Sequence, residues 1–387
     1  MKNNLISLFF TILRSTLHGF QISDADKRLV TSDLLEDILK LASKHDIAHL
    51  LALGIVNSGL VDEETKSLFQ QIIFRAVYRY EKLNYELMQV CEALEKARIP
   101  FLTLKGSVIR KYYPEPWMRT SCDIDVLVHE KDLRAAVSYL VGNLKYTEHE
   151  QNSHDISLFS PSGNHIELHY DLVEDHIAGN SSGILADIWN VVSVKDGCSY
   201  HYEVPDDVFY FYHIAHMAKH FKNGGCGIRP FMDLWILDKL QGADREKRDR
   251  LLKQGELLKF TNAARKLSRV WFANEEHDPI SRQMEDYVLR GGVYGNIQNR
   301  IVMQQQQKGG RLRYLLSKVF LSYDIIKFHY PILQKHRWLT PVMEVRRWFK
   351  LIFCGHLKRT TREIQYNHQI TREEAANAKE FLENIGL

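Results

Sequence analysis

The sequence lacks the features that mark several large protein classes. Its 387 residues include only five cysteines, and no two of them form a C-x-x-C pair, so neither a zinc ribbon nor a disulfide framework is indicated. No apolar run is long enough to cross a bilayer. The phosphate-binding motifs G-x-x-x-x-G-K-[ST] and G-x-G-x-x-G are both absent, which argues against a Walker-type kinase and a dinucleotide-dependent dehydrogenase.

The bulk composition is that of an ordinary globular protein. Hydrophobic residues make up 45% of the chain and charged residues 26%, and the length allows two domains or more. Scattered cysteines are typical of a reducing compartment, so we expect a cytoplasmic protein. Residues 5–13 resemble the apolar part of a short signal peptide, but Arg14 and His18 follow without a small-residue cleavage site. We therefore expect this segment to be the first amphipathic helix.

The periodicity of apolar residues divides the chain into three regions. Residues 1–98 and 201–387 read as helical, with one long helix at 65–97 and two later helices at 208–221 and 228–240. The central region, 99–200, mixes both patterns: strands are expected at 101–104, 122–128, 154–159 and 165–172, and helices at 108–113 and 131–141. This order predicts an α+β protein in which a small α/β core with a mixed sheet is embedded in helical regions.

Three carboxylates stand on the predicted strands of the central region. Strand side chains alternate between the two faces, so Asp123 and Asp125 point the same way, and Glu167 joins them from a separate strand. His165 and His169 share the face of Glu167. Oxygen ligands without a cysteine cage suit Mg²⁺, or Mn²⁺, shared with the phosphates of a substrate. The sequence therefore predicts metal-assisted phosphoryl or nucleotidyl transfer, with these three carboxylates as ligands and catalytic groups.

The turn that precedes these strands is suited to phosphate. Gly106 lets the backbone approach a ligand closely, and Ser107 stands at the expected start of a helix, where free N–H groups and the helix dipole favour an anion. Lys105 and Arg119 would neutralise charge on the triphosphate. We expect an in-line attack of an acceptor on the α-phosphorus of a nucleoside triphosphate, with pyrophosphate as the leaving group and Glu167 as a candidate base.

These residues resemble the nucleotidyltransferase superfamily that includes DNA polymerase beta. Its pattern is Gly-[Gly/Ser], then [Asp/Glu]-x-[Asp/Glu], then a third acidic residue on a later strand, and Lys-Gly-Ser is within that pattern. The sequence looks more closely like the bacterial family of uncharacterised nucleotidyltransferases over most of its length. The segments that carry this likeness are residues 104–106, 113–116, Arg119, 123–128, 166–169, His213, His216, His220, 229–234, 330–331 and 339–341.

The resemblance implies metal roles for Asp123, Asp125 and Glu167 and a phosphate-loop role for Gly106 and Ser107. It also implies an NTP substrate and a polymerase-beta-like core. It does not imply an acceptor, which could be a small molecule, a protein or an RNA end. The alternative from another class is a regulatory protein of the same fold that binds nucleotide without turnover, although intact carboxylates favour an enzyme. The oligomeric state is not indicated.

The later helical region carries a second group of polar residues. His213, His216 and His220 fall on one face of the predicted helix, and we expect a packed or hydrogen-bonded face near the cleft, with zinc ligation as the alternative. Arg229 and Asp233 are four residues apart and are expected to pair within their helix. Their alternative role is contact with the nucleotide or the acceptor.

Two clusters of basic and aromatic residues raise the question of a nucleic-acid partner. The first combines Tyr78, Tyr80 and Tyr85 with neighbouring arginines and a lysine; we expect packing between helices, with base stacking as the alternative. The second lies between residues 308 and 362, where 13 Lys and Arg face two acidic residues. We expect these charges on the wet side of amphipathic helices, and an RNA-modifying enzyme that uses this basic region is the alternative.

Overall fold

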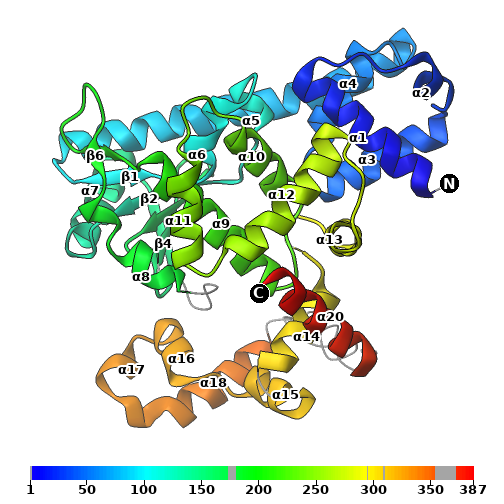
Figure 1. Cartoon of the computed structure of the whole chain (residues 1–387). Coiled ribbons are helices and arrows are strands. Elements are labelled where there is room, and N and C mark those ends of the chain that lie inside the picture. Colours follow the sequence, from blue (N-terminus) through cyan, green and yellow to red (C-terminus); the bar gives the residue numbers. More distant parts are fainter. Residues whose placement is uncertain (1, 173–179, 294, 308–309, 354–371) are drawn as a thin grey trace.

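The computed structural model describes residues 2–172, 180–293, 295–307, 310–353 and 372–387. In these ranges the chain forms many helices around one mixed sheet of seven strands, which confirms the predicted α+β class (Figure 1). The strand order is β3-β4-β5-β2-β1-β7-β6. The strands are β1 (Phe101–Thr103), β2 (Asp123–Val128), β3 (Thr147–Gln151), β4 (Asp155–Phe159), β5 (His165–His169), β6 (Ser193–Val194) and β7 (His201–Glu203).

The pairing of the strands brings the two predicted metal-binding strands together. β2 and β5 are parallel neighbours at the centre of the sheet, while β1 lies antiparallel on the other side of β2. β3 is a strand that the sequence did not reveal. Its residues Thr147-Glu148-His149-Glu150-Gln151 are all polar, because it is an exposed edge strand with no apolar face to bury.

Helices precede the sheet, connect its strands and follow it. The first group is α1 (Lys2–His18), α2 (Asp24–Arg28), α3 (Ser32–Lys44), α4 (Ala48–Asn57) and α5 (Glu63–Lys96), and the sheet region adds α6 (Gly106–Ile109), α7 (Leu133–Leu144) and α8 (Ser181–Ala186). Next come α9 (Asp206–Lys222), α10 (Arg229–Asp238), α11 (Arg245–Gln254), α12 (Leu258–Ala273) and α13 (Pro279–Arg290). The last are α14 (Ile297–Gln307), α15 (Arg311–Val319), α16 (Tyr323–His329), α17 (Ile332–Lys335), α18 (Thr340–Phe353) and α20 (Arg372–Ile385).

The 34-residue helix α5 joins the N-terminal helices to the sheet (Figure 1). It begins where the side chain of Asp62 accepts a hydrogen bond from the backbone N–H of Thr65, and Glu63 and Glu64 favour its first turn. Its outer face is unusual, because Tyr78 and Tyr85 are each 64% exposed. The prediction that these tyrosines pack between helices was therefore wrong.

Two hydrophobic clusters hold the described residues together. The larger one joins the N-terminal helices, one face of the sheet and α9 to α12, with Leu50, Leu127 and Phe260 among its members. The smaller one fills the space between the opposite sheet face, α5 and α7, and includes Val126 and Leu140. Alternation along β2 thus sends its residues to two cores. The predicted region boundaries at residues 98 and 200 stay a prediction, because the larger cluster contains residues of all three regions.

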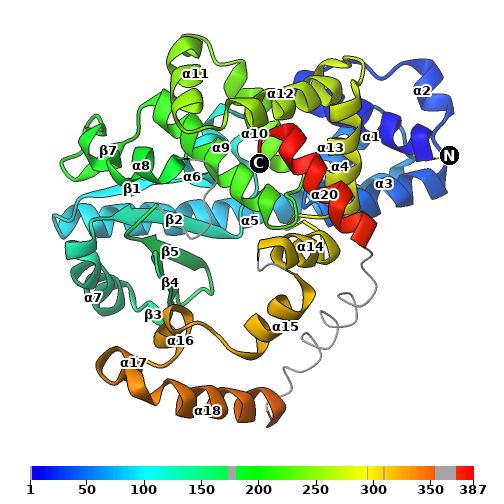
Figure 2. The ribbon, with the colours of Figure 1, turned by 60° about the horizontal axis from the view of Figure 1, so that its bottom comes forward.

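Helices α15 to α18 form a group that lies below the sheet in Figure 1 and is connected to the other helices through α14, which α15 contacts (Figures 1 and 2). We call residues 310–353 the C-terminal lobe; the other residues of the predicted basic region, 308–309 and 354–362, lie outside the described ranges. Its helices are only partly amphipathic as expected, because several of their apolar side chains are exposed. Exposed side chains include those of Leu316, Phe320, Ile325, Trp338, Trp348 and Phe349, whereas Ile326 is buried.

Within the described ranges, we find no helix with the length and apolar character needed to cross a membrane.

Candidate active site

The register of two parallel strands brings the predicted catalytic residues side by side. Asp125 on β2 lies beside Glu167 on β5, and Asp123 lies beside His165. Their side chains leave the sheet on the face that α9 covers, because they alternate with Ile124 and Val126, which enter the opposite core. The three carboxylates and His165 and His169 are thus brought together as the alternation predicted.

Lys105 and His169 hold the inner pair of carboxylates. The Nζ of Lys105 donates a hydrogen bond to Oδ1 of Asp125 at 2.7 Å and lies 4.0 Å from Oε2 of Glu167. The Nε2 of His169 lies 2.9 Å from the same Asp125 oxygen and 3.4 Å from the same Glu167 oxygen. One lysine and one imidazole therefore contact two oxygens that the sequence assigned to a metal.

The charges of this group shift the acidities in opposite directions. Burial raises the pKa of Asp123, and the neighbouring charges of Asp125 and Glu167 raise it further. Burial also opposes ionisation of Asp125, but Lys105 and the hydrogen bond from His169 hold its pKa far below the usual range. Burial also opposes ionisation of Glu167, but the hydrogen bond from His169 and the charges of Lys105 and His169 together lower its pKa. Within the described part of the chain, Asp123 is the one of these three carboxylates that forms no ion pair.

The donor set fits a hard divalent cation. There are two groups of residues in which the possible ligand atoms all lie within 4.8 Å of one another. One group is Asp123, His165 and Glu167, and the other is Asp125, Glu167 and His169. Carboxylate oxygens suit Mg²⁺ and Mn²⁺, and imidazole nitrogens are acceptable to Mn²⁺. Glu167 belongs to both groups, so it stands between the two positions. A divalent cation bound among these carboxylates would oppose the effect of burial and of the neighbouring negative charges, which raise the pKa of Asp123.

The turn before α6 is tightly built. Gly106 is buried, and a Cβ atom at its position would lie 3.2 Å from Cβ of Ser121, so the glycine permits this close approach. Gly106 and Lys105 line the cavity in front of the carboxylates. Ser107 is not among the lining residues, and its backbone N–H donates to the carbonyl of Leu104 at 3.2 Å. The phosphate-binding role of Ser107 stays a prediction.

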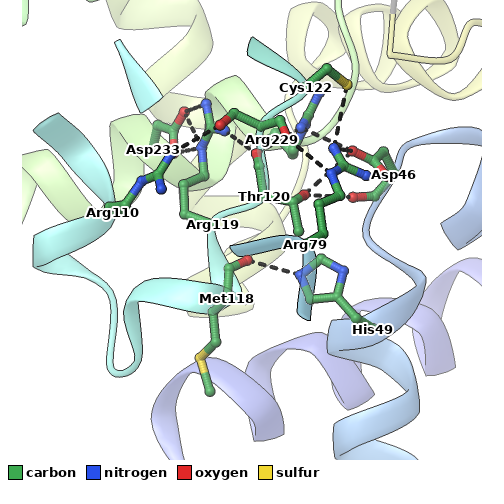
Figure 3. A network of polar contacts seen from close by, with 11 residues as sticks. Asp46, His49, Arg79, Arg110, Met118, Arg119, Thr120, Cys122, Arg229 and Asp233 are labelled. Carbon is green, nitrogen blue, oxygen red and sulfur yellow. Dashed lines mark hydrogen bonds and ion pairs between the residues drawn. The ribbon is translucent and has the colours of Figure 1, made fainter. Parts of the chain in front are cut away.

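Arg119 and Asp233 form a buried ion pair that the sequence did not reveal. Nε of Arg119 lies 2.7 Å from Oδ1 of Asp233, and Nη2 lies 2.8 Å from Oδ2. Tyr113 donates a further hydrogen bond to Oδ1 at 2.6 Å. The expected pair within α10 is not formed, because Arg229 donates instead to Asp46 at 3.1 Å and to the carbonyl of Thr120 at 2.9 Å (Figure 3).

This polar network fixes the segment that leads into β2. Figure 3 shows the guanidinium groups of Arg79 and Arg229 directed at Asp46, which comes from the loop between α3 and α4. Nε of Arg79 also donates to the carbonyl of Ser121 at 2.9 Å. The N-terminal helices are thereby tied to the residues just before Asp123. No motif in the sequence marks Asp46 for this role, because its partners are brought to it only by the tertiary fold.

The histidines of α9 face the same cavity as the carboxylates. His213, His216 and His220 all line it, and Nε2 of His220 lies 2.9 Å from Nε2 of His216. Nε2 of His213 lies 3.2 Å from the carbonyl of Pro230, so this nitrogen carries the proton. Burial and the charge of Lys105 lower the pKa of His216 to about 3, so its imidazole is neutral. This is the hydrogen-bonded helix face that the spacing predicted; the zinc alternative gains no third ligand among the described residues.

The cavity measures about 460 Å³ and contains residues that the sequence reading missed. His154 and Asp155, at the start of β4, line the cavity beside His169. Nε2 of His154 lies 3.4 Å from Oδ1 of Asp155. Lys219 lines it from α9, and burial together with the charge of Lys105 lowers its pKa to about 8. The position of Lys219, next to His220 on the same helix, was the one available clue.

A family comparison agrees with this geometry. The family model described as "uncharacterised nucleotidyltransferase" matches residues 32–273, which is more than half of the chain. The chain belongs to this family. It is therefore a nucleotidyltransferase, an enzyme that transfers phosphorus-containing groups. The search of curated proteins and the search of solved structures each found no match.

The matched range of this nucleotidyltransferase contains the whole cavity except Val293. It begins at α3, so it includes Asp46 and the network that ties the N-terminal helices to β2. It ends at α12, and the C-terminal lobe lies beyond it. The matched range thus covers the candidate site, and the family description names no acceptor.

Proposed function

We propose that this nucleotidyltransferase moves the nucleoside monophosphate of an NTP to an acceptor, with a divalent cation held by Asp123, Asp125 and Glu167. The cation would be Mg²⁺ or Mn²⁺, and an NTP supplies the phosphates that complete its oxygen ligands. The observation that carries the proposal is the meeting of these three carboxylates at one end of a 460 Å³ cavity whose other walls present lysine and histidine. Four free cysteines among the described residues support a reducing, cytoplasmic setting.

In the proposed reaction, an oxygen or nitrogen of the acceptor attacks the α-phosphorus of the NTP. The bond between that phosphorus and the oxygen bridging to the β-phosphorus breaks, and pyrophosphate leaves with the bonding electrons. The acceptor's proton passes to a carboxylate, and Glu167 is the candidate because its side chain is only partly buried. When bound, the cation would neutralise phosphate charge and favour the leaving oxygen.

The cavity residues have separable tasks in this proposal. Lys105 is the ammonium nearest to the carboxylates and therefore to the phosphates. Arg119 and Arg229 line the cavity, but their contacts with Asp233 and Asp46 show that they also fix its walls. Gly106 lets the backbone of the turn face the phosphates closely.

The test is isothermal titration of each of the four NTPs with Mg²⁺, on the wild type and on Asp123→Asn. We expect binding of one NTP that needs the metal and is lost in the variant, and a drop of about 100-fold or more in pyrophosphate release, because transition-state charge is no longer neutralised. Asp196→Asn, the same change at an exposed carboxylate outside the cavity, is the matched control. Metal-independent binding, or equal binding by Asp123→Asn, would contradict the proposal.

A second candidate narrows the acceptor to RNA. The C-terminal lobe exposes aromatic rings beside basic side chains: Trp338 is 75% exposed and Phe349 59%, and Arg346 and Lys350 are exposed on α18. Aromatic faces and positive charge are the two components of single-strand binding surfaces. The lobe would then bring an RNA end to the cavity.

A further inference from the structure

We propose that Lys105 is an internal counterion of the metal ligands. Its ammonium must release these ligands before a divalent cation binds, and it then contacts the triphosphate. This inference rests on the proposed function and adds to it an order of events. It makes metal and nucleotide binding mutually dependent, since the same ammonium contacts the carboxylates in one state and the phosphates in the other.

The first argument is the identity of the contacted atoms. Nζ of Lys105 lies 2.7 Å from Oδ1 of Asp125 and 4.0 Å from Oε2 of Glu167. These two residues, with His169, form one of the two groups of possible metal ligands. A divalent cation bound to the same oxygens would stand within a few ångströms of the ammonium, and the like charges would repel each other in this buried setting. The two cations therefore exclude each other.

The second argument is the backbone of Lys105. Its φ is +46° and its ψ is −121°, a conformation that side-chain-bearing residues rarely adopt. Lys145 and Asn274 also have positive φ, but with ψ of 32° and 34° they occupy the ordinary left-handed region at helix ends. A glycine would adopt the conformation of Lys105 at less cost. The surrounding structure thus holds a lysine, and not a glycine, in this turn, which directs its side chain to the carboxylates.

The third argument is what the other cavity cations contact. Arg119 is bound bidentately to Asp233, and Arg229 bonds to Asp46 and the carbonyl of Thr120. Their partners belong to the walls and keep them there whether or not a cation is bound. Lys105 differs because its ion-pair partners among the described residues are the metal ligands themselves. A divalent cation bound to those ligands would free the Lys105 ammonium to pair with another anion. In the proposed reaction that anion is the triphosphate of the NTP.

Two opposite effects follow from the exchange. Removing the ammonium should strengthen metal binding in the absence of nucleotide, because the competitor is gone. It should weaken nucleotide binding in the presence of metal, because the triphosphate loses a partner. Coupling between the two ligands is reciprocal, so it should diminish in both directions. A lysine that only supports the fold would not move the two affinities in opposite senses.

The experiment measures Mn²⁺ binding to the full chain without nucleotide, from the electron paramagnetic resonance signal of the free ion. Lys105→Met is expected to bind Mn²⁺ about ten-fold more tightly or better than the wild type, because a competing like charge is removed. Lys105→Gln, which keeps hydrogen-bond donors without charge, should behave in the same way and serves if the methionine variant does not fold. Lys219→Met removes a second cavity charge and should change the Mn²⁺ affinity far less.

The outcomes separate this inference from the function on which it rests. Mn²⁺ binding that is unchanged or weaker in Lys105→Met and Lys105→Gln, or equally tightened in Lys219→Met, overturns the counterion role. If Asp123→Asn still abolishes Mn²⁺ binding in that case, the metal site itself stands. Mn²⁺ binding that both Asp123→Asn and Asp125→Asn leave intact overturns the metal site and the counterion role together.

Discussion

The residues behind the cavity wall include a histidine whose surroundings suit only its neutral form. His45 ends α3, is fully buried, and has no hydrogen-bond partner in the described structure for either ring nitrogen. Nδ1 lies 3.3 Å from where a Cβ of Gly227 would be, and Gly227 lines the cavity. Burial, with a smaller effect of the Lys44 charge, lowers the pKa of His45 to about 4. The folded protein thus binds a proton here much less readily than the unfolded chain.

The sign of the resulting pH dependence follows from this lowered pKa. Well above pH 6.5 His45 is neutral in both states and contributes nothing to the pH slope. As the pH falls from 6.5 to 4, the unfolded chain takes up the proton and the folded protein does not, so about 3 kcal/mol of stability is lost. We expect His45→Met to reduce this acid loss and to keep or raise stability at pH 7, because two unmet nitrogens are removed.

The measurement is urea unfolding of the wild type and His45→Met at a series of pH values from 7 to 4.5. The matched control is His149→Met on the edge strand β3, where the imidazole is exposed and the slope should remain that of the wild type. An identical acid slope in His45→Met and the wild type would show that protonation of His45 is not linked to unfolding.

Among the elements, those with a clear apolar pattern could be predicted and those built by tertiary contacts could not. β2 and β5 were found because Ile124, Val126, Ile166 and Leu168 alternate with polar residues, and the same alternation placed the carboxylates on one face. β3 carries no apolar face and was missed. At the site, local spacing wrongly paired Arg229 with Asp233, because a buried carboxylate takes the partner with the best geometry, wherever the fold brings it from.

Helix packing supplies a test at this scale, because α1 and α4 meet at a glycine. A Cβ atom at Gly54 would lie 2.7 Å from Cγ2 of Ile12 and would collide with Oγ1 of Thr16. Thr16 cannot easily move, since its hydroxyl donates to the carbonyl of Leu50 at 2.9 Å. We expect Gly54→Ala to destabilise the protein by about 1–3 kcal/mol through overpacking, although alanine is the better helix former by about 1 kcal/mol.

The matched control is a helical glycine with open space around it. Gly142 in α7 is exposed, and a Cβ there would meet nothing within 4 Å. Gly142→Ala should therefore gain about 0.5–1 kcal/mol from helix propensity alone. Urea unfolding curves of both variants give the comparison. The same sign of change in the two variants would mean that the α1–α4 contact does not decide the effect at Gly54.

On the scale of the whole molecule, charge is distributed unevenly between the lobe and the remainder. The chain carries a net charge of +3, yet residues 308–362, which include the lobe, carry 13 basic and two acidic side chains, so the rest is net acidic. In the lobe, Glu344 is buried, accepts a hydrogen bond from the backbone of Leu321 and pairs with Arg347. The exposed face of α18 therefore presents basic and aromatic side chains, while its acidic residue Glu344 is buried.

This distribution leads to the last prediction, which decides whether the acceptor is RNA. If the lobe binds single strands, a fluorescein-labelled 20-nucleotide RNA should bind the full protein with an affinity that falls steeply as salt rises. Trp338→Ala should weaken binding by about 1–3 kcal/mol through the loss of a stacked base. Arg346→Glu should lower both the affinity and the salt slope. The variant leaves the carboxylates at the cavity, which carry the pyrophosphate-releasing chemistry, unchanged.

The control for this prediction must change charge without touching the lobe. Lys96→Glu, at the exposed end of α5, makes the same kind of reversal on a side chain that is 65% exposed. Equal weakening by Lys96→Glu and Arg346→Glu would mean that RNA responds only to net charge. RNA binding that neither salt nor the lobe variants alter would contradict the proposal that the lobe presents RNA as the acceptor. The acceptor would then be sought among molecules small enough to enter the cavity beside Asp155 and Lys219, where the remaining polar groups converge.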